Sequence, residues 1–162
     1  MRVLVSVPYA SGEDTRIAKR DYADLLAEAD IVVCLAISSP ETRDLFDAAA
    51  FARMKRGARF INLSRGELVD ERALEAALDS GQLSGAAMDV GRAQDQRPSA
   101  FLARRPDVLA APHIAGMTPE AMEHQAMDTV HQIAALARGE MPENAVNAPA
   151  AHRLARIGVR PG

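Results

Sequence analysis

The chain has 162 residues, a mass of 17.4 kDa and a formal net charge of −3. With 48% apolar and 25% charged residues, its composition is that of a folded domain and excludes a disordered tail or a collagen-like chain. The weakly acidic charge argues against a nucleic-acid partner, and 17 Arg against 2 Lys, beside 32 Ala, is typical of GC-rich coding rather than of a phosphate-binding surface.

The predicted elements alternate between short apolar runs and helical patterns. Strands are expected over residues 3–7, 31–35, 59–63, 84–90 and 108–110, and helices over 21–29, 47–54, 70–78 and 118–138. Pro8 ends the first run because proline cannot donate to a strand ladder. The continuous apolar run 31–35 is typical of a strand that is buried on both faces. This alternation predicts a doubly wound α/β fold with a parallel sheet covered on both faces.

Capping residues give the clearest helix boundaries. Asp70 is an expected N-cap followed by acidic residues, and Gly81 is the expected stop of that helix. Thr118 and Pro119 together predict the start of the long helix, since proline is favoured at the first helical position. Residues 91–106 are expected to form a loop, and the segment after Gly139 a loose tail.

Cys34 is the single cysteine of the chain and cannot form an internal disulfide. No Cys/His cluster has the spacing of a zinc site, so we predict no metal. A reducing, cytoplasmic compartment is therefore expected. We also expect no membrane partner, because no apolar run reaches the roughly 18 residues of a membrane span. Residues 1–8 lack a small-residue cleavage site and are expected to form a strand rather than a signal peptide.

The glycine pattern argues against a complete dinucleotide-binding fold. Such folds normally open with a strand, a GxGxxG loop and a helix. No two of the ten glycines are separated by a single residue, so GxGxxG is absent from the chain, and a Walker A loop is absent as well. Any function proposed for the chain has to be compatible with this absence.

Arg65 lies between the end of a predicted strand and the N-cap of the next helix. This places it at the carboxyl edge of the sheet, where ligands bind in this fold class. A guanidinium there can hold a carboxylate through two hydrogen bonds and polarise an adjacent carbonyl. The alternative is a surface arginine that pairs with Glu67 or Asp70.

Two more segments place polar residues at strand ends. His113 follows a predicted strand, with Pro112 restricting its backbone and Gly116 allowing a tight turn. Its imidazole could act as an acid/base, although a lone histidine is more often structural. Asp89 ends a strand of small residues, where the alternative is a helix cap or turn former.

Together these segments resemble the D-isomer-specific 2-hydroxyacid dehydrogenases, including their formate and phosphoglycerate dehydrogenase branches. The family patterns N-x-x-R-G-x-x-V-D, G-x-x-x-D-V and P-H-I-x-G-x-T occur in this order within residues 1–148, and segments 39–43 and 47–58 match as well. The resemblance implies an NAD- or NADP-dependent enzyme that transfers hydride between the nicotinamide and a small 2-hydroxy or 2-keto acid. The cofactor carries the hydride and the protein orients it.

The resemblance also assigns roles to individual residues. It implies that Arg65 binds the substrate carboxylate, that His113 exchanges a proton with the substrate hydroxyl, and that Asp89 faces the nicotinamide carboxamide. Further cofactor contacts are expected from Ser39, Leu63, Ser64 and Gly116. The family is typically dimeric, so we expect a homodimer or a complementing chain.

Gln94 occupies the position at which most family members place a Glu that orients the histidine. A carboxylate there would raise the pKa of His113, whereas an amide can hold the ring without that effect. Formate dehydrogenases of the family also have Gln at this position, which keeps formate-type chemistry as an alternative. The surrounding Gly91-Arg92-Ala93 matches neither branch. Neutral sequence drift is therefore an equal alternative explanation of Gln94.

Val7 stands where the family places the acid that binds the adenosine ribose hydroxyls, which leaves the choice between NAD and NADP open. Arg16, Lys19 and Arg20 could meet a 2′-phosphate, but a solvated surface is the preferred interpretation of these three residues.

By the resemblance, residues 1–148 form a partial dinucleotide-binding domain and 149–162 a tail. The first strand, glycine loop and helix, as well as the substrate domain, are absent. In the usual strand order 3-2-1-4-5-6 the absent strand is central, so two half-sheets with unpaired inner edges are expected. The pyrophosphate would also lose its helix N-terminus, which predicts poor dinucleotide binding by this chain alone. The alternatives are an enzyme fragment completed by another segment, and a non-catalytic remnant or assembly module.

Overall fold

A computed structural model describes residues 1–7, 17–143, 145 and 148–159. The chain forms two compact units, residues 1–115 and 116–162, and each is described by itself. The first unit contains every strand that the structure describes. These strands are β1 (Val3–Val5), β2 (Ile17–Lys19), β3 (Ile31–Cys34), β4 (Ala58–Asn62), β5 (Leu83–Met88) and β6 (Val108–Ala110).

The strands form two parallel sheets, one with the order β1-β2 and the other with the order β3-β4-β5-β6. This confirms the predicted Rossmann-like α/β class. Five of the six strands lie within two residues of their predicted positions. The strand β2 was not predicted, because its three residues, Ile-Ala-Lys, carry no alternating pattern and pair only with β1.

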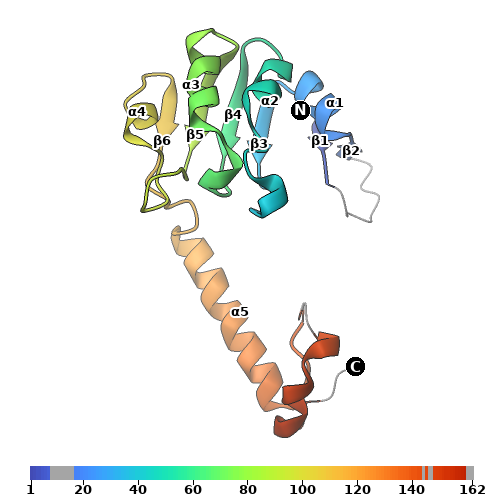
Figure 1. Cartoon of the computed structure of the whole chain (residues 1–162). Helices are drawn as coiled ribbons and strands as arrows, with labels where there is room; N and C mark the ends of the chain where they lie inside the picture. Colours follow the sequence, from blue (N-terminus) through green and yellow to red (C-terminus); the bar gives the residue numbers. More distant parts are fainter. Residues whose placement is uncertain (8–16, 144, 146–147, 160–162) are drawn as a thin grey trace. The chain divides into compact units, whose positions relative to one another are not determined.

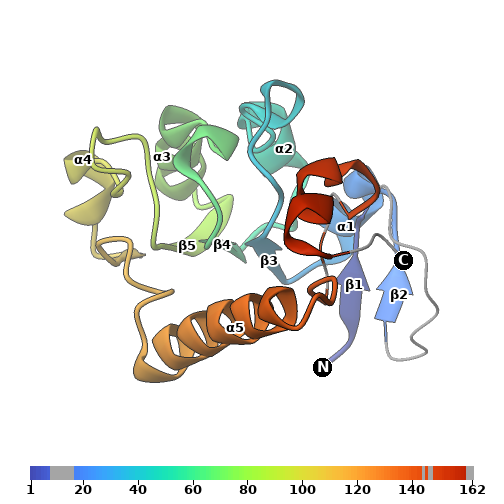
Figure 2. The same ribbon diagram turned by 90° about the horizontal axis from the view of Figure 1, so that it is seen from below.

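The break between the two sheets lies between β1 and β3. Strand β1 runs beside β3, on the side away from β4 (Figures 1 and 2). However, β1 pairs only with β2, and β3 only with β4, among the described residues. The expected pair of unpaired inner edges is therefore present, and both belong to the first unit.

Four helices pack against one face of the larger sheet. These are α1 (Tyr22–Glu28), α2 (Ala48–Arg53), α3 (Glu71–Asp79) and the single turn α4 (Ala100–Ala103). Apolar side chains of each helix share one core with β3, β4, β5 and β6. Its centre is an aromatic cluster in which the ring of Phe60 lies 4.7 Å from Phe46 and 5.3 Å from Phe51, measured between centroids. The α4 turn corrects the expectation that residues 91–106 form only loop.

Local capping explains where these helices begin. The Asp47 carboxylate accepts a hydrogen bond from Ala50 N, and Asp70, the N-cap that the sequence predicts, accepts from the backbone N–H groups of Arg72 and Ala73. Each bond satisfies a donor that the first helical turn leaves free. Asp21 occupies the N-cap of α1 but makes no capping hydrogen bond through its side chain.

The expectation that the run 31–35 is buried on both faces is wrong. Val32 and Cys34 are buried, but Ile31 is 47% and Val33 46% exposed. The reason is that the four helices of the first unit share a core with only one face of this strand. Leu63 and Leu109 are also exposed, so several large apolar side chains of this sheet are accessible.

The second unit begins with the long helix α5 (Pro119–Ala137), whose N-cap Thr118 accepts from Ala121 N. Its start and end agree with the prediction. The segment expected to be a loose tail contains two short 3-10 helices, Ala148–Ala150 and His152–Ile157. Of the helices that the structure describes, none is both long and apolar enough to cross a membrane.

Candidate functional site

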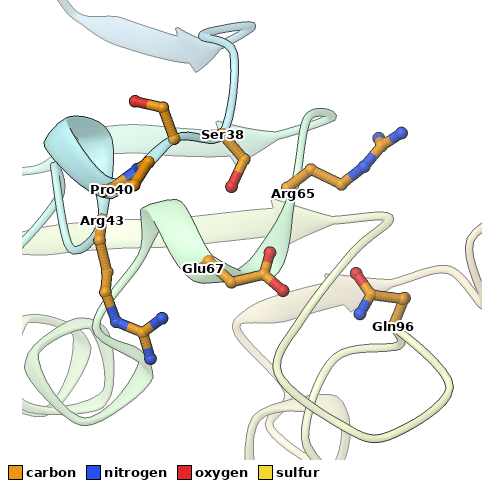
Figure 3. A pocket seen from close by; sticks show the side chains of 7 residues that line it. Ser38, Pro40, Arg43, Arg65, Glu67 and Gln96 are labelled. Atoms are coloured by element: carbon orange, nitrogen blue, oxygen red, sulfur yellow. The ribbon is translucent and has the colours of Figure 1, made fainter.

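An open pocket of about 570 Å³ lies among the turns that follow β3, β4 and β5 (Figure 3). Its lining consists of Ser38, Ser39, Pro40, Arg43, Arg65, Glu67 and Gln96. Two of these residues, Ser39 and Arg65, are predicted site residues. Because parallel strands end at one edge of a sheet, these three turns converge there, as the sequence predicts.

The main chain at Arg65 is fixed by the buried side chain of Asn62, the last residue of β4. Its Nδ2 donates to Arg65 O at 3.0 Å, and its Oδ1 accepts from Ser64 N at 3.0 Å. The Ser64 hydroxyl donates to the carbonyl of Ala36, which joins this turn to the segment after β3. A fully buried amide with both ends bonded gives the turn a single geometry.

The side chain of Arg65 is exposed and makes no ion pair within the described part of the chain. Its Nη1 donates only to the neighbouring Ser64 O, at 2.7 Å. The alternative of a surface pair with Glu67 or Asp70 is therefore wrong. In Figure 3 the guanidinium extends away from Glu67, whose carboxylate extends toward Gln96. The guanidinium retains donors for an external carboxylate.

His113 is held indirectly, through the turn that follows it. Asp89, only 5% exposed, accepts Ile114 N at Oδ1 (2.8 Å) and Ala115 N at Oδ2 (2.9 Å). Asp89 is thus a turn former, which the sequence left open, and both of its oxygens are engaged by the main chain. The imidazole of His113 is partly buried and has no hydrogen-bond partner among the described residues.

Asp89→Asn is expected to destabilise the first unit by about 2 kcal/mol, because an amide has one acceptor oxygen and would turn a second donor toward a buried N–H group. Denaturant unfolding measures this loss, and amide exchange should rise at Ile114 and Ala115. Asp95→Asn, an exposed carboxylate in the next loop, is the matched control and should change stability by less than about 0.5 kcal/mol. Equal losses in both variants would contradict the assignment of this clamp.

Three non-glycine residues near this sheet edge adopt left-handed backbone conformations: Asp44 (φ 54°), Gln96 (φ 63°) and His113 (φ 59°). Such conformations cost free energy and are concentrated at functional sites. Gly116 was expected to provide the tight turn, but its φ is not left-handed. His113 itself has the left-handed conformation. Gly116 belongs to the second unit.

The other predicted residues are placed as follows. Gln94 is exposed and does not line the pocket, whereas Gln96, two residues later, does. Leu63 follows β4 and is exposed. Arg16 lies outside the described residues, and the Arg20 guanidinium pairs with Glu28 at 2.9 Å. Gln96 could have been found only by knowing that Gly91 N bonds to Gln96 O and turns this loop back on itself.

Metal and thiol chemistry find no support at this edge. Within the described residues no three His, Cys, Asp or Glu side chains are grouped to hold a metal ion. Cys34 is buried at the end of β3, and burial raises the pKa of its thiol. A thiol in that state is a poor nucleophile at neutral pH.

Comparison with known proteins agrees with this geometry. Residues 1–115 match the NAD-binding domain of D-isomer specific 2-hydroxyacid dehydrogenases. A glyoxylate/hydroxypyruvate reductase B of Escherichia fergusonii is 39% identical over 127 residues, which cover 78% of this chain and 39% of that protein. The chain spans 24% of the length of one similar curated protein and 39% to 40% of others.

Solved structures give the same result. A D-lactate dehydrogenase of Lactobacillus jensenii with NAD+ is 28% identical at a TM-score of 0.77, covering 88% of this chain and 47% of that one. A D-isomer specific 2-hydroxyacid dehydrogenase of Xanthobacter autotrophicus in complex with NADPH is 32% identical at a TM-score of 0.68, covering 83% and 57%. With the arginine and histidine turns in register at one sheet edge, the chain belongs to the D-isomer specific 2-hydroxyacid dehydrogenase family.

Proposed function

We propose that this chain forms the larger part of the cofactor domain of an NAD- or NADP-dependent 2-hydroxyacid dehydrogenase, acting on a small 2-hydroxy or 2-keto acid. The observation that carries the proposal is the arrangement at the sheet edge. Arg65 has no ion pair within the described residues and stands on a turn that Asn62 fixes. His113 follows β6, at the same edge of the sheet and with β5 between it and β4, on a turn that Asp89 fixes.

The chain's own residues would divide the work between binding and proton transfer. Arg65 holds the substrate carboxylate, which orients the 2-carbon. His113 gives a proton to the keto oxygen or takes one from the hydroxyl, since its imidazole is not engaged elsewhere in the described residues. The nicotinamide cofactor, when bound, supplies or accepts the hydride. We propose that Asp89, Ser39 and the main chain at Leu63 and Ser64 line the nicotinamide end.

The described residues suit the nicotinamide end of a dinucleotide better than its pyrophosphate end. A pyrophosphate needs a glycine-rich turn and a helix N-terminus directed at it. In space, no described strand pairs with both β1 and β3, and no glycine-rich turn leads from such a strand into a helix. Full cofactor affinity and turnover therefore need a further segment at that position.

A second candidate is a non-catalytic remnant or assembly module of the same fold. The exposed Gln94 and the exposed Val7, in place of two acids, favour it. Cofactor binding accompanied by normal turnover would exclude it. Within the first proposal, formate-type chemistry stays an alternative because formate has no hydroxyl proton for His113 to remove.

We also propose that the protein is a cytoplasmic homodimer. The exposed apolar side chains Ile31, Val33 and Leu109 support self-association, since such side chains on one sheet favour burial against a partner. The single buried thiol suits a reducing compartment. Sedimentation of the purified chain tests whether it forms a dimer.

Thermal unfolding with and without millimolar NADH and NADPH tests the proposed function. At a cofactor concentration tenfold above Kd, the stabilisation is about 1.4 kcal/mol, which raises the Tm by several degrees in a domain of this size. We expect a small shift or none for the chain alone, and a turnover screen on small 2-keto acids should then be run on the chain completed by a strand and glycine loop. A completed chain with no cofactor shift and no turnover would overturn the proposal.

A further inference from the structure

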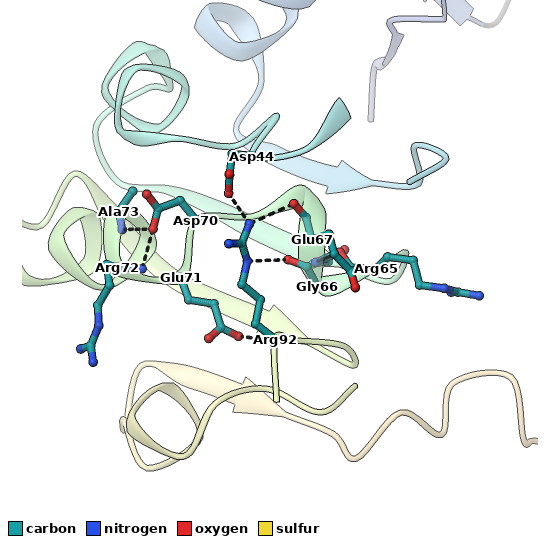
Figure 4. A network of polar contacts seen from close by, with 10 residues as sticks. Asp44, Arg65, Gly66, Glu67, Asp70, Glu71, Arg72, Ala73 and Arg92 are labelled. Atoms are coloured by element: carbon teal, nitrogen blue, oxygen red, sulfur yellow. Dashed lines mark hydrogen bonds and ion pairs between the residues drawn. The ribbon is translucent and has the colours of Figure 1, made fainter. Parts of the chain in front are cut away.

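Arg92 lies outside the pocket lining, yet its guanidinium contacts the loops that form the pocket (Figure 4). Its Nε donates to Gly66 O at 3.3 Å and its Nη2 to Glu67 O at 3.0 Å, so it holds the turn that presents Arg65. The same Nη2 forms an ion pair with Asp44, next to the pocket residue Arg43. One side chain on the loop after β5 thus joins the loops after β3 and β4.

The backbone at Arg92 is fixed as well. Glu71 is buried at the start of α3, and its Oε1 accepts Arg92 N at 3.1 Å. The other oxygen of the same carboxylate accepts the hydroxyl of Ser99. On the pocket side, Gly91 N donates to Gln96 O at 2.8 Å. Both ends of the loop are therefore anchored, and the guanidinium projects from a rigid base.

Gly66 allows the loop to approach the Arg65 turn so closely, and Gly91 allows the loop to fold back on itself. A Cβ at Gly66 would lie 2.1 Å from Gly91 O, and a Cβ at Gly91 would lie 2.4 Å from Pro98 Cα. A side chain at Gly66 would push the loop away from the turn, and one at Gly91 would collide with the loop's own backbone at Arg97 and Pro98. The close backbone contact brings the Arg92 side chain within reach of two carbonyls of the turn.

The ion pair between Arg92 and Asp44 holds a residue with an unusual backbone conformation. Its backbone is left-handed, and its N–H donates to Glu67 O at 2.9 Å. Arg92 therefore holds both the carboxylate of Asp44 and the carbonyl to which Asp44 donates. The conformation of this strained residue, and with it the wall at Arg43, depends on a contact from a distant loop.

We propose that Arg92 is a positioning residue for the carboxylate site at Arg65, an inference that rests on the proposed function. It does not touch the substrate. It fixes the loops after β3, β4 and β5 in one arrangement before a ligand arrives, so that binding does not have to order them. The sequence gives no hint of this role, since Gly91-Arg92-Ala93 departs from the family pattern.

The test compares Arg92→Gln, Arg92→Lys and the control Arg97→Gln in the full chain. Arg97 is an exposed arginine on the same loop whose partner is the nearby Asp95. Two properties are measured by NMR: amide exchange at Asp44 and Val69, which donate to the two carbonyls that Arg92 also holds, and the affinity for oxamate, an unreactive 2-keto acid mimic.

Arg92→Gln is expected to speed exchange of both amides about tenfold and to weaken oxamate binding about tenfold, because three charge-assisted contacts are lost. Arg92→Lys should recover only part of the amide protection and part of the oxamate affinity. An ammonium can pair with Asp44 but lacks the planar fork that reaches two carbonyls. Arg97→Gln should change neither property.

Unchanged exchange, or oxamate affinity equal to that of the wild type, in Arg92→Gln would overturn the proposal. Full recovery of affinity in Arg92→Lys would overturn it too, because charge alone would then account for the loss. If the wild-type chain itself fails to bind oxamate, the proposed function loses its substrate site. The exchange rates still decide in that case whether Arg92 holds the loops.

Discussion

Supplying a strand–GxGxxG–helix segment, fused ahead of Met1 or added as a second chain, is expected to raise NADH affinity at least about a hundredfold. Two phosphate contacts at a helix N-terminus, at about 1.5 kcal/mol each, account for about 3 kcal/mol. The open position between β1 and β3 is suited to receive the strand. Isothermal titration with NADH measures the change, and the melting temperature should rise with it.

The register of the sheets shows which groups would hold the added strand. Asp30 O accepts Arg59 N and Cys34 O accepts Leu63 N, so even-numbered residues of β3 face β4. Since successive residues of a strand alternate, Ile31 and Val33 direct their backbone groups to the open edge. The added strand would then lie parallel to both of its neighbours, β1 and β3.

Val33→Pro is the matched control for this experiment. Proline removes one N–H from the open edge and leaves the β3–β4 ladder untouched, so the variant should fold but not accept the added strand. A second control replaces the loop glycines of the added segment, which should keep the strand and lose the cofactor. If the completed sheet is more stable but NADH still does not bind, the assignment of this position to the cofactor fails.

Phe60→Ala is expected to cost about 3 to 5 kcal/mol of folding free energy, since it removes a large side chain and leaves a cavity. Phe60 is fully buried in β4, and its ring contacts those of Phe46 and Phe51. Total stabilities of about 5 to 15 kcal/mol make this loss large enough to unfold a marginal domain. Urea unfolding followed by circular dichroism measures it.

Phe101→Ala makes the same chemical change at a partly buried site. Its ring lies under the Arg72 guanidinium, 3.9 Å from centroid to Cζ. The loss there should be about 1 to 2 kcal/mol, from partial burial and the cation–π contact. Phe60→Leu should fall between the two. Similar losses at Phe60 and Phe101 would show that the aromatic cluster is not the centre of the core.

Features that depend on neighbouring residues were predictable from the sequence. Asp70 and Thr118 cap helices as predicted, because the cap bond spans only two or three residues. The placement of Arg65 at the sheet edge followed from the strand that precedes it.

Features that depend on distant contacts could not be predicted. The burial of β3 on a single face depends on which helices pack against it, and the clamp from Asp89 to Ile114 joins residues 25 apart in the chain. Whether Gln94 or Gln96 lines the pocket depends on how the loop closes. No local pattern of residues determines these contacts.

The open edge of β3 also affects how the protein behaves in solution. The segment 31–37, Ile-Val-Val-Cys-Leu-Ala-Ile, has no charge and no proline, and no described strand pairs with the outer edge of its β3 part, Ile31–Cys34. Short uncharged segments of high β-propensity on a free edge are templates for aggregation. The yield of soluble protein in a cell should therefore depend on how quickly this edge is covered after synthesis.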